Sequence, residues 1–152
     1  MELDAINWQA GWRSLCAEHP DEFARRVDAA TEGAAWVCDG NYGQVGPLIR
    51  ARATHLIWLD YDRSVIMARV IRRSIARAFD SRPLWADNRE DWRRWLHASH
   101  PIRWAWETWA RRRTQLEAML ADEALGHLEV RRLRRPVEAD ALLRRVESGG
   151  AL

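Results

Sequence analysis

The sequence predicts an α/β fold, in which a parallel sheet carries helices on both of its faces. Short apolar runs typical of strands alternate with longer segments of helical periodicity. Strands separated by helices favour right-handed crossovers, which make neighbouring strands parallel. The composition, 47% hydrophobic and 30% charged over 152 residues, is that of one globular domain. We assign residues 1–147 to this domain and residues 148–152 to a loose tail.

The first third of the chain carries two predicted strands and one helix. Residues 2–6 alternate polar and apolar side chains as a short strand does, although coil is an alternative so close to the terminus. A helix is expected over residues 20–32, because proline and two acids open it and a glycine follows it. The apolar run Ala35–Asp39 ends at Gly40 and predicts a buried strand that enters a turn.

The remaining two thirds predict two further strands and four helices. Thr54–Asp60 is the clearest strand, and after it the period changes to that of a helix over residues 62–79, which Asp62 can cap. Later elements are a helix over residues 90–98, a helix over 101–121, a strand over 127–133 and a helix over 136–146. The apolar stripe expected on the helix over 101–121 consists of Trp106, Trp109, Leu116 and Leu120.

Several classes of protein are disfavoured by the sequence. No apolar run approaches the roughly 20 residues that cross a bilayer, so we expect a soluble protein without a membrane partner. The first residues have neither the basic start nor the apolar segment of a signal peptide, which predicts a cytoplasmic location. Cys16 and Cys38 are then reduced thiols, and no cluster of Cys and His has the spacing of a zinc site.

Charge is distributed unevenly along the chain. Residues 1–60 carry five arginines against nine acids, whereas residues 61–135 carry seventeen arginines against ten acids. The basic segment suggests an anionic ligand or partner. All 24 basic residues are arginine, which either reflects a GC-rich genome or suits bidentate contacts with phosphate oxygens.

Three aspartates are expected at or beside the ends of predicted strands. Asp4, Asp39 and Asp60 occupy these positions, and ligands of open α/β sheets bind at the carboxyl ends of the strands. Together they could hold a divalent cation through water or accept a proton from a substrate hydroxyl. Alternatively, each aspartate only caps the turn or helix that follows it.

Four arginines form one stripe on the helix after the clearest strand. Arg69, Arg72, Arg73 and Arg77 have the spacing i, i+3, i+4 and i+8. Held over a site, such a stripe could bind a transferring phosphoryl group. As a solvated face it needs no ligand, and the spacing leaves both interpretations open.

Two other patterns have competing interpretations. Six of the ten tryptophans lie within residues 85–109 among arginines, an arrangement that can stack single-stranded nucleic acid but that helical spacing here assigns to core packing. Gly40, Gly43 and Gly46 resemble a phosphate loop only loosely, because no lysine or hydroxyl residue follows and Pro47 removes a backbone donor. We interpret the glycines as turn and irregular helix.

A resemblance to a known family emerges from several short runs in their order and spacing over nearly the whole chain. These runs resemble the adenylate-kinase-like P-loop proteins often called DNA topology modulation proteins. The runs are Glu2-Leu3-Asp4-Ala5 with Trp8 and Gly11-Trp12, Trp36-Val37-Cys38-Asp39-Gly40-Asn41-Tyr42, Ile57-Trp58-Leu59-Asp60 with Arg63, Asn88-Arg89-Glu90, Trp104-Ala105-Trp106, and Arg111-Arg112-Arg113.

The resemblance implies a three-layer nucleotide-kinase core that binds ATP and Mg²⁺ and has an arginine-bearing lid over about residues 62–100. Catalysis would involve Asp4, Asp39, Arg69 and Arg73, and Asp60 would contact the magnesium ion through water. The acceptor pocket would be formed by Asp4, Trp8, Asp39, Gly40, Asn41 and Tyr42. The nucleotide phosphates would be bound by Arg69, Arg72, Arg73 and Arg77.

The sequence departs from this family at its start. Family members begin with a strand, a glycine-rich loop bearing a lysine, and a helix, whereas this sequence starts at the second strand and contains no lysine. The family's sheet order is 2-3-1-4-5, so the missing strand is the central one. The strands near Trp36 and Ile57 would pair directly, remain loose, or accept a strand from another chain, unless the gene begins upstream; we favour an upstream start.

Three hypotheses for function follow. The first is an ATP-dependent phosphotransferase acting on a small acceptor, truncated in the sequence given. The second is a non-catalytic kinase fold whose basic lid binds an anion or a partner protein. The third is a nucleic-acid-binding protein that uses the segment rich in arginine and tryptophan. The sequence does not determine the oligomeric state.

Overall fold

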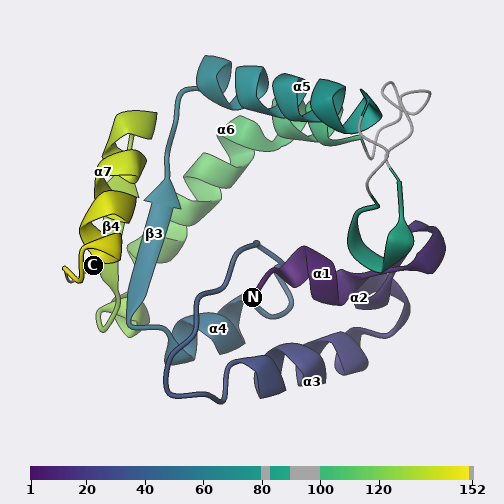
Figure 1. Ribbon diagram of the computed structural model, residues 1–152. Coiled ribbons are helices and arrows are strands. Elements are labelled where there is room, and N and C mark those ends of the chain that lie inside the picture. Colours follow the sequence, from purple (N-terminus) through teal and green to yellow (C-terminus); the bar gives the residue numbers. More distant parts are fainter. Residues whose placement is uncertain (80–82, 90–99, 151–152) are drawn as a thin grey trace. The chain divides into compact units, whose positions relative to one another are not determined.

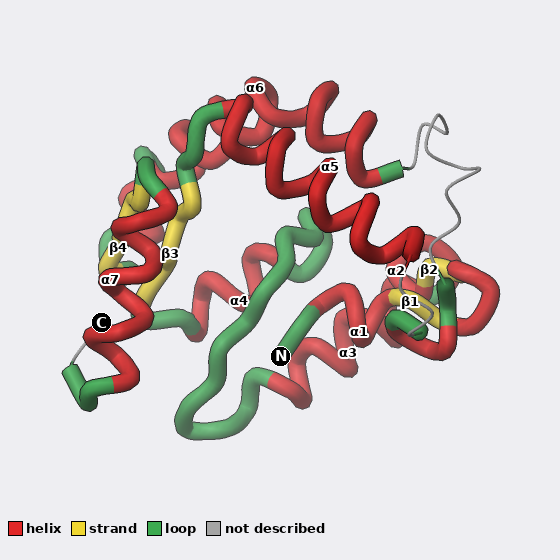
Figure 2. The backbone as a smooth tube through the Cα atoms, turned by 45° about the horizontal axis from the view of Figure 1, so that its top comes forward, coloured by secondary structure: helices red, strands yellow, loops and turns green. Residues whose placement is uncertain are grey.

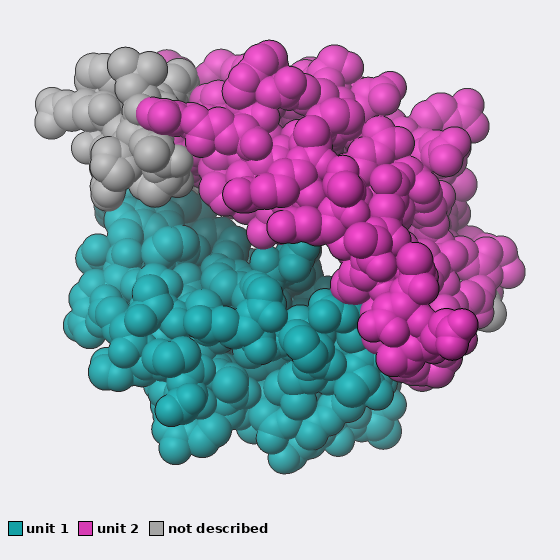
Figure 3. Space-filling model, turned by 180° about the vertical axis from the view of Figure 1, so that it is seen from behind, with its two compact units in different colours: residues 1–53, 80–90 teal, residues 54–79, 91–152 magenta. Residues whose placement is uncertain are grey.

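The computed structural model describes residues 1–79, 83–89 and 100–150. The chain divides into two compact units, coloured separately in Figure 3: unit 1 comprises residues 1–53 and 80–90, and unit 2 comprises residues 54–79 and 91–152. Of the lid-like segment predicted over residues 62–100, residues 62–79 lie in unit 2 and residues 83–89 lie in unit 1. That residues 1–147 form one domain stays a prediction.

Unit 1 is mainly helical and contains one very short hairpin (Figures 1 and 2). Its core consists of Leu3, Leu15, Phe23, Val27 and Val45, each no more than 6% exposed. Its elements are α1 (Leu3–Asn7), β1 (Trp8–Gln9), the 3₁₀ turn η1 (Ala10–Trp12), β2 (Arg13–Ser14), α2 (Leu15–Glu18), α3 (Pro20–Ala30), α4 (Gly46–Arg52) and the 3₁₀ turn η2 (Trp85–Asp87).

The helix predicted over residues 20–32 is confirmed as α3. Pro20 stands in its first turn together with two acids, where the missing N–H of proline costs nothing and negative charge is favourable. Phe23 and Val27 are one helical turn apart, and both are completely buried. The spacing of these two residues therefore attaches α3 to the core of unit 1.

The strand predicted at residues 2–6 is wrong, because this segment forms the short helix α1. Leu3 and Asn7 lie four residues apart, so a helix places both on the buried side, where they are 0% and 1% exposed. Asn7 is held there because its side-chain oxygen accepts hydrogen bonds from Cys16 N at 2.9 Å and Ser14 Oγ at 3.0 Å. Burial of this second side chain favours the helical period over the alternating one.

The buried strand predicted at Ala35–Asp39 is also wrong. Val37 is 79% exposed, and the segment is a loop with one parallel bridge, from Glu2 to Asp39. Asp39 N donates to Met1 O at 2.9 Å, and Leu3 N donates to Asp39 O at 2.8 Å. Pairing cannot continue, because the partner segment turns into α1 after Glu2.

Unit 2 contains a parallel pair of strands and three helices among its described residues (Figure 1). The predicted strands at residues 54–60 and 127–133 are confirmed, and so are three predicted helices. The elements are β3 (His55–Leu59), α5 (Arg63–Phe79), α6 (Pro101–Leu120), the 3₁₀ turn η4 (Glu123–Leu125), β4 (Glu129–Leu133) and α7 (Pro136–Glu147). The helix predicted over residues 90–98 lies outside the described residues.

The two strands of unit 2 run parallel, as predicted for strands connected through helices. His55 is opposite Glu129 and Leu59 is opposite Leu133. The ladder continues past both strands, since Glu129 N donates to Thr54 O at 2.9 Å and Asp60 N donates to Leu133 O at 2.8 Å. The described fold is thus mixed α/β with a small parallel sheet, and no described helix is long and apolar enough to span a membrane.

Two predicted details of unit 2 need correction. The buried positions of α6 are Ala105 and Thr108, whereas Trp106 of the predicted stripe is 55% exposed. Residues 148–150 of the predicted loose tail are bound to the last turn of α7, because Gly149 has a φ of 82° and Gly150 N donates to Arg145 O at 2.9 Å. A glycine in this conformation ends a helix and satisfies its last carbonyls.

Candidate functional site

In unit 1 the structure brings Asp4 and Tyr42 together. The Tyr42 hydroxyl donates to Asp4 Oδ1 at 2.5 Å, and the tyrosine ring packs against the fully buried Phe23 with 5.1 Å between ring centroids. Burial, and secondly the hydrogen bond to Asp4, raise the pKa of Tyr42 far above its usual range. The phenol therefore stays protonated at neutral pH and holds one carboxylate oxygen of Asp4 as a donor.

Asp39 and Gly40 lie beside the start of α1, next to Asp4. Leu3 N donates to the Asp39 carbonyl at 2.8 Å. Gly40 has a φ of 124°, and a Cβ atom at this position would lie 2.8 Å from the Leu3 Cβ. Both the backbone conformation and the close approach to Leu3 therefore require glycine. Four of the six residues predicted for the acceptor pocket, Asp4, Asp39, Gly40 and Tyr42, are adjacent in unit 1.

The other two predicted pocket residues have different surroundings. Trp8 lies in β1 and packs edge to face against Trp12, with 5.5 Å between ring centroids. Asn41 is exposed in the loop that follows Gly40.

Asn88 positions the hairpin of unit 1 and is a residue whose role the sequence did not predict. It is 5% exposed, donates to Gln9 O at 2.8 Å and accepts from Trp12 N at 2.9 Å. It thus connects residues 83–89 to the hairpin across more than seventy residues of sequence. A single asparagine between two predicted helices gives no signal of such a distant contact.

In unit 2, Asp60 lies directly after β3, as predicted, and its side chain is 3% exposed. The carboxylate is bound by two guanidinium groups: Arg132 Nε donates to Oδ2 at 2.8 Å, and an Arg113 nitrogen lies 3.2 Å from the same oxygen. Glu117 also binds Arg132 at 2.7 Å, and the Arg132 guanidinium lies 4.1 Å from the centre of the Trp58 ring. These charged pairs join the end of β3 to β4 and α6.

The surroundings of Asp60 do not fit a magnesium ion. Mg²⁺ prefers a shell of oxygen ligands, whereas the carboxylate of Asp60 faces two positive charges. Among residues 1–79, 83–89 and 100–150, no three His, Cys, Asp or Glu side chains gather closely enough to bind a metal. The arrangement instead has the form of an ion-pair cluster around the buried Asp60, with equal numbers of acids and arginines.

The predicted arginine stripe lies on α5 in unit 2. Arg69, Arg72 and Arg73 are exposed, and Arg77 is half-buried. The Arg69 guanidinium lies 5.1 Å from the ring centre of Tyr61. Within the described part of the chain, none of Arg69, Arg72 and Arg73 forms a salt bridge, so their charges remain available to an anion. The aspartates of unit 1 belong to a separately described unit, and their predicted convergence with Asp60 and α5 stays a prediction.

Comparison with known proteins gives no relative of this chain: no family model, no curated protein and no solved structure matches it. The resemblance to adenylate-kinase-like proteins therefore stays a hypothesis.

Proposed function

We propose that this chain provides the acceptor-binding and phosphate-binding parts of a nucleotide-kinase-like phosphotransferase, which transfers a phosphoryl group from ATP to a small acceptor. In this proposal unit 1 binds the acceptor, and the arginines of α5 bind phosphate oxygens.

The observation that carries the proposal is which segments of the chain pair with each other in parallel. Glu2 bridges Asp39 in parallel, and β3 pairs with β4 in parallel. In a sheet of order 2-3-1-4-5, the second strand neighbours the third, and the fourth neighbours the fifth. Numbered in chain order, the segment at Glu2 is the second strand, the segment at Asp39 is the third, β3 is the fourth and β4 is the fifth. Both observed pairs then agree with this order.

The group around Asp4 supports an acceptor site. A carboxylate oriented by a neutral phenol can accept the proton of an attacking hydroxyl through its second oxygen. The Asp39–Asn41 loop is exposed close to this carboxylate, and Gly40 lets its backbone approach Leu3 closely. A nucleotide, a small alcohol and a protein hydroxyl all fit a carboxylate base of this kind.

The exposed arginines of α5 support binding of phosphate. Guanidinium groups bind phosphate oxygens through paired N–H donors, and phosphoryl transfer is accelerated mainly by such charge stabilisation and positioning. Residues 1–152 contain no lysine, so the lysine and glycine-rich loop of a P-loop site would have to come from additional sequence. ATP with its magnesium ion is then the expected ligand of the extended protein.

The deciding experiment measures ATP binding by calorimetry, with and without Mg²⁺, for this chain and for the product of the same reading frame extended upstream of Met1. We expect weak binding by the present chain and tight, magnesium-dependent binding by the extended one. In the extended protein, Asp4→Asn should lower the rate of transfer at least about 100-fold by removing the base, with little change in ATP affinity.

Arg73→Ala in the extended protein should weaken ATP binding, and Arg25→Ala on α3 is the matched control, because Arg25 is already paired with Glu22. An upstream frame without a glycine-rich loop, or an extended chain that fails to bind ATP, would overturn the proposal.

A non-catalytic anion-binding protein is the second candidate. The specific observation in its favour is that Asp60 is neutralised by Arg113 and Arg132, while Arg69, Arg72 and Arg73 lack acidic partners among the described residues. This candidate would be favoured if the extended protein binds inorganic phosphate, or an anionic segment of a partner, but transfers no phosphoryl group.

A further inference from the structure

The two long helices of unit 2, which pack against each other, carry many more arginines than acids. Together α5 and α6 contain nine arginines and two glutamates, and α5 contains no acid at all. Both glutamates are already paired: Glu107 binds Arg103 at 2.7 Å, and Glu117 binds Arg132 at 2.7 Å. The helices therefore attract a partner that brings many negative charges.

Two tryptophans of α6 are exposed although the sequence assigned this region to the core. Trp104 is 45% exposed and Trp106 is 55% exposed. Each ring is covered on one side by a guanidinium group, that of Arg112 at 4.5 Å from the Trp104 centroid and that of Arg63 at 3.4 Å from the Trp106 centroid. Each indole ring still has exposed surface on which a second flat group can stack. The guanidinium group on the ring adds a positive charge next to that surface.

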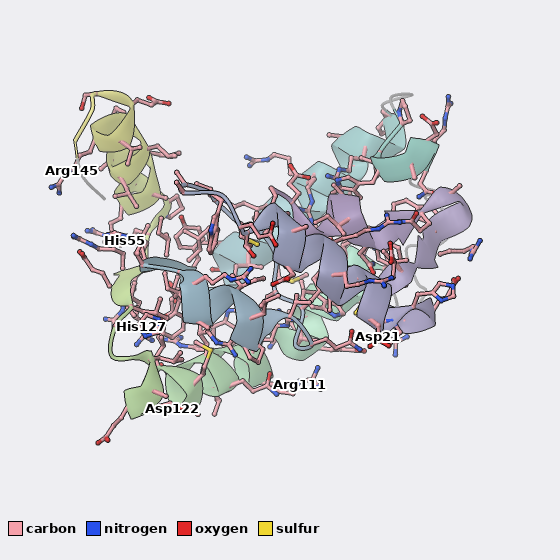
Figure 4. All side chains as sticks on the ribbon, turned by 90° about the horizontal axis from the view of Figure 1, so that it is seen from below. Asp21, His55, Arg111, Asp122, His127 and Arg145 are labelled. Carbon is pink, nitrogen blue, oxygen red and sulfur yellow. The ribbon has the colours of Figure 1, made fainter. Side chains whose placement is uncertain are left out.

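The helical period places these two rings on either side of the solvent face of α6. At about 100° per residue, Trp104 and Trp106 are about 200° apart, with the buried Ala105 between them on the inner side. Arg103, Glu107 and Arg111 fall between the rings on the outer side, where Arg103 pairs with Glu107 and Arg111 forms no salt bridge within the described part of the chain. Figure 4 shows Arg111 extending away from α6, and Arg111 is exposed. The outer face of α6 thus presents arginine between two aromatic borders.

We propose that this face of α6, defined by Trp104, Trp106 and Arg111 and assisted by the exposed arginines of α5, binds single-stranded nucleic acid. Its phosphates meet the guanidinium groups, and its unpaired bases stack on the indole rings. A duplex supplies the phosphates but hides the faces of its bases, and a lipid headgroup or polyphosphate has no ring to stack. Single strands therefore fit both features of the face.

The first test titrates the full chain into fluorescein-labelled oligo(dT) and follows fluorescence anisotropy. With three to four phosphates neutralised, affinity should fall about 20- to 50-fold as salt rises from about 50 to about 200 mM, since each single-strand contact contributes a slope of roughly 0.7. An unlabelled duplex of equal length should compete less well than unlabelled oligo(dT).

Substitutions separate stacking from charge. Trp104→Ala and Trp106→Ala should each weaken binding about 5- to 150-fold at fixed salt and leave the salt slope unchanged, while Trp104→Phe and Trp106→Phe retain most of the affinity. Arg111→Ala should lower the salt slope by about 0.7. Arg25→Ala, which removes an exposed arginine of unit 1, should change neither quantity.

Circular dichroism of each variant checks that it folds. If an alanine variant does not fold, the phenylalanine variants still test the proposal. Absence of binding at low salt overturns the proposal. It is equally overturned if the duplex or heparin competes as well as oligo(dT), or if folded tryptophan-to-alanine variants bind like the parent, because binding is then attraction of a polyanion alone.

Discussion

At the scale of single residues, the structure gives the predicted acids different roles. Asp60 is nearly inaccessible and bound to two arginines, whereas Asp4 is oriented by the hydroxyl of Tyr42. The sequence grouped both as aspartates at strand ends. Which partner each carboxylate meets depends on residues 38 to 72 positions away, and no local pattern encodes those partners.

Replacement of Asp60 should strongly destabilise unit 2. Asp60→Ala leaves Arg113 and Arg132 without their shared carboxylate, and breaking a buried pair costs about 3–5 kcal/mol of unfolding free energy. The lower end applies here, because both arginines are about one-third exposed. Urea denaturation measures the change. Glu129→Ala is the control, since its pairs with Arg131 and His55 are exposed, and it should cost less than about 1 kcal/mol. Equal costs for the two variants would contradict the structural role of Asp60.

Tyr42 should make unit 1 sensitive to alkaline pH. Its pKa is raised mainly by burial, so the folded state prefers the neutral phenol more than the unfolded chain does. The stability that this preference contributes is fully present below the ordinary tyrosine pKa of about 10 and is lost as pH rises above it. Tyr42→Phe should cost about 1–2 kcal/mol at neutral pH and flatten this alkaline loss.

Denaturation at several pH values measures both effects, and Tyr61→Phe is the matched control. Tyr61 is 2% exposed, and its hydroxyl has no hydrogen-bond partner within the described part of the chain, so its removal should cost little or stabilise unit 2. An unchanged alkaline profile for Tyr42→Phe would argue against the burial of the Tyr42 hydroxyl beside Asp4.

At the scale of elements, β3 has one paired and one open edge. Alternate residues of a parallel strand bond to a given neighbour, and the bonds of Thr54 O and Asp60 N to β4 show that the even-numbered residues face that strand. The N–H groups of Ile57 and Leu59 therefore point to the other edge. No described strand pairs there, and the two side chains are 43% and 50% exposed.

Hydrogen exchange should show this alternation directly. The amides of Leu56, Trp58 and Asp60 should be protected, while those of Ile57 and Leu59 should exchange much faster, because they lack a ladder partner. Residue-resolved exchange by NMR measures the contrast. Uniform protection along β3 would mean that a further strand occupies the open edge, as the predicted order with a central strand requires.

The elements also show where sequence periodicity was sufficient. The helices α3, α5, α6 and α7 and the strands β3 and β4 were predicted, because each has a clear period or a proline at its start. The segments at residues 2–6 and 35–39 were predicted wrongly. Both are five residues long, and a run of this length fits either period until its neighbours decide which side chains are buried.

At the scale of the whole molecule, the fully buried apolar side chains among the described residues belong to unit 1, in the cluster of Leu3, Phe23, Val27 and Val45. Phe23 lies at its centre with no exposed surface. Phe23→Ala should cost about 3–5 kcal/mol and accelerate exchange in residues 1–53 and 83–89, with little effect on α5, α6 and β3, because compact units open separately. The milder Phe23→Leu keeps the fold if the alanine variant does not.

Exchange mass spectrometry of parent and variant measures the distribution. Leu143→Ala on α7 is the control, because Leu143 is 60% exposed and its replacement should change neither unit. Equal acceleration of both units by Phe23→Ala would mean that residues 1–147 unfold as the single domain that the sequence predicts.

The sequence by itself determined the mixed α/β class, the parallel direction of β3 and β4, most helices and the basic character of α5 and α6. These features follow from local periodicity, capping residues and composition, which act between residues close in the chain. Tertiary structure alone decided that residues 2–6 are helical, that Asp60 is neutralised by arginines, that Tyr42 orients Asp4 and that Trp104 and Trp106 are exposed. Each depends on contacts between distant segments, where burial and the pairing of charges outweigh local preference.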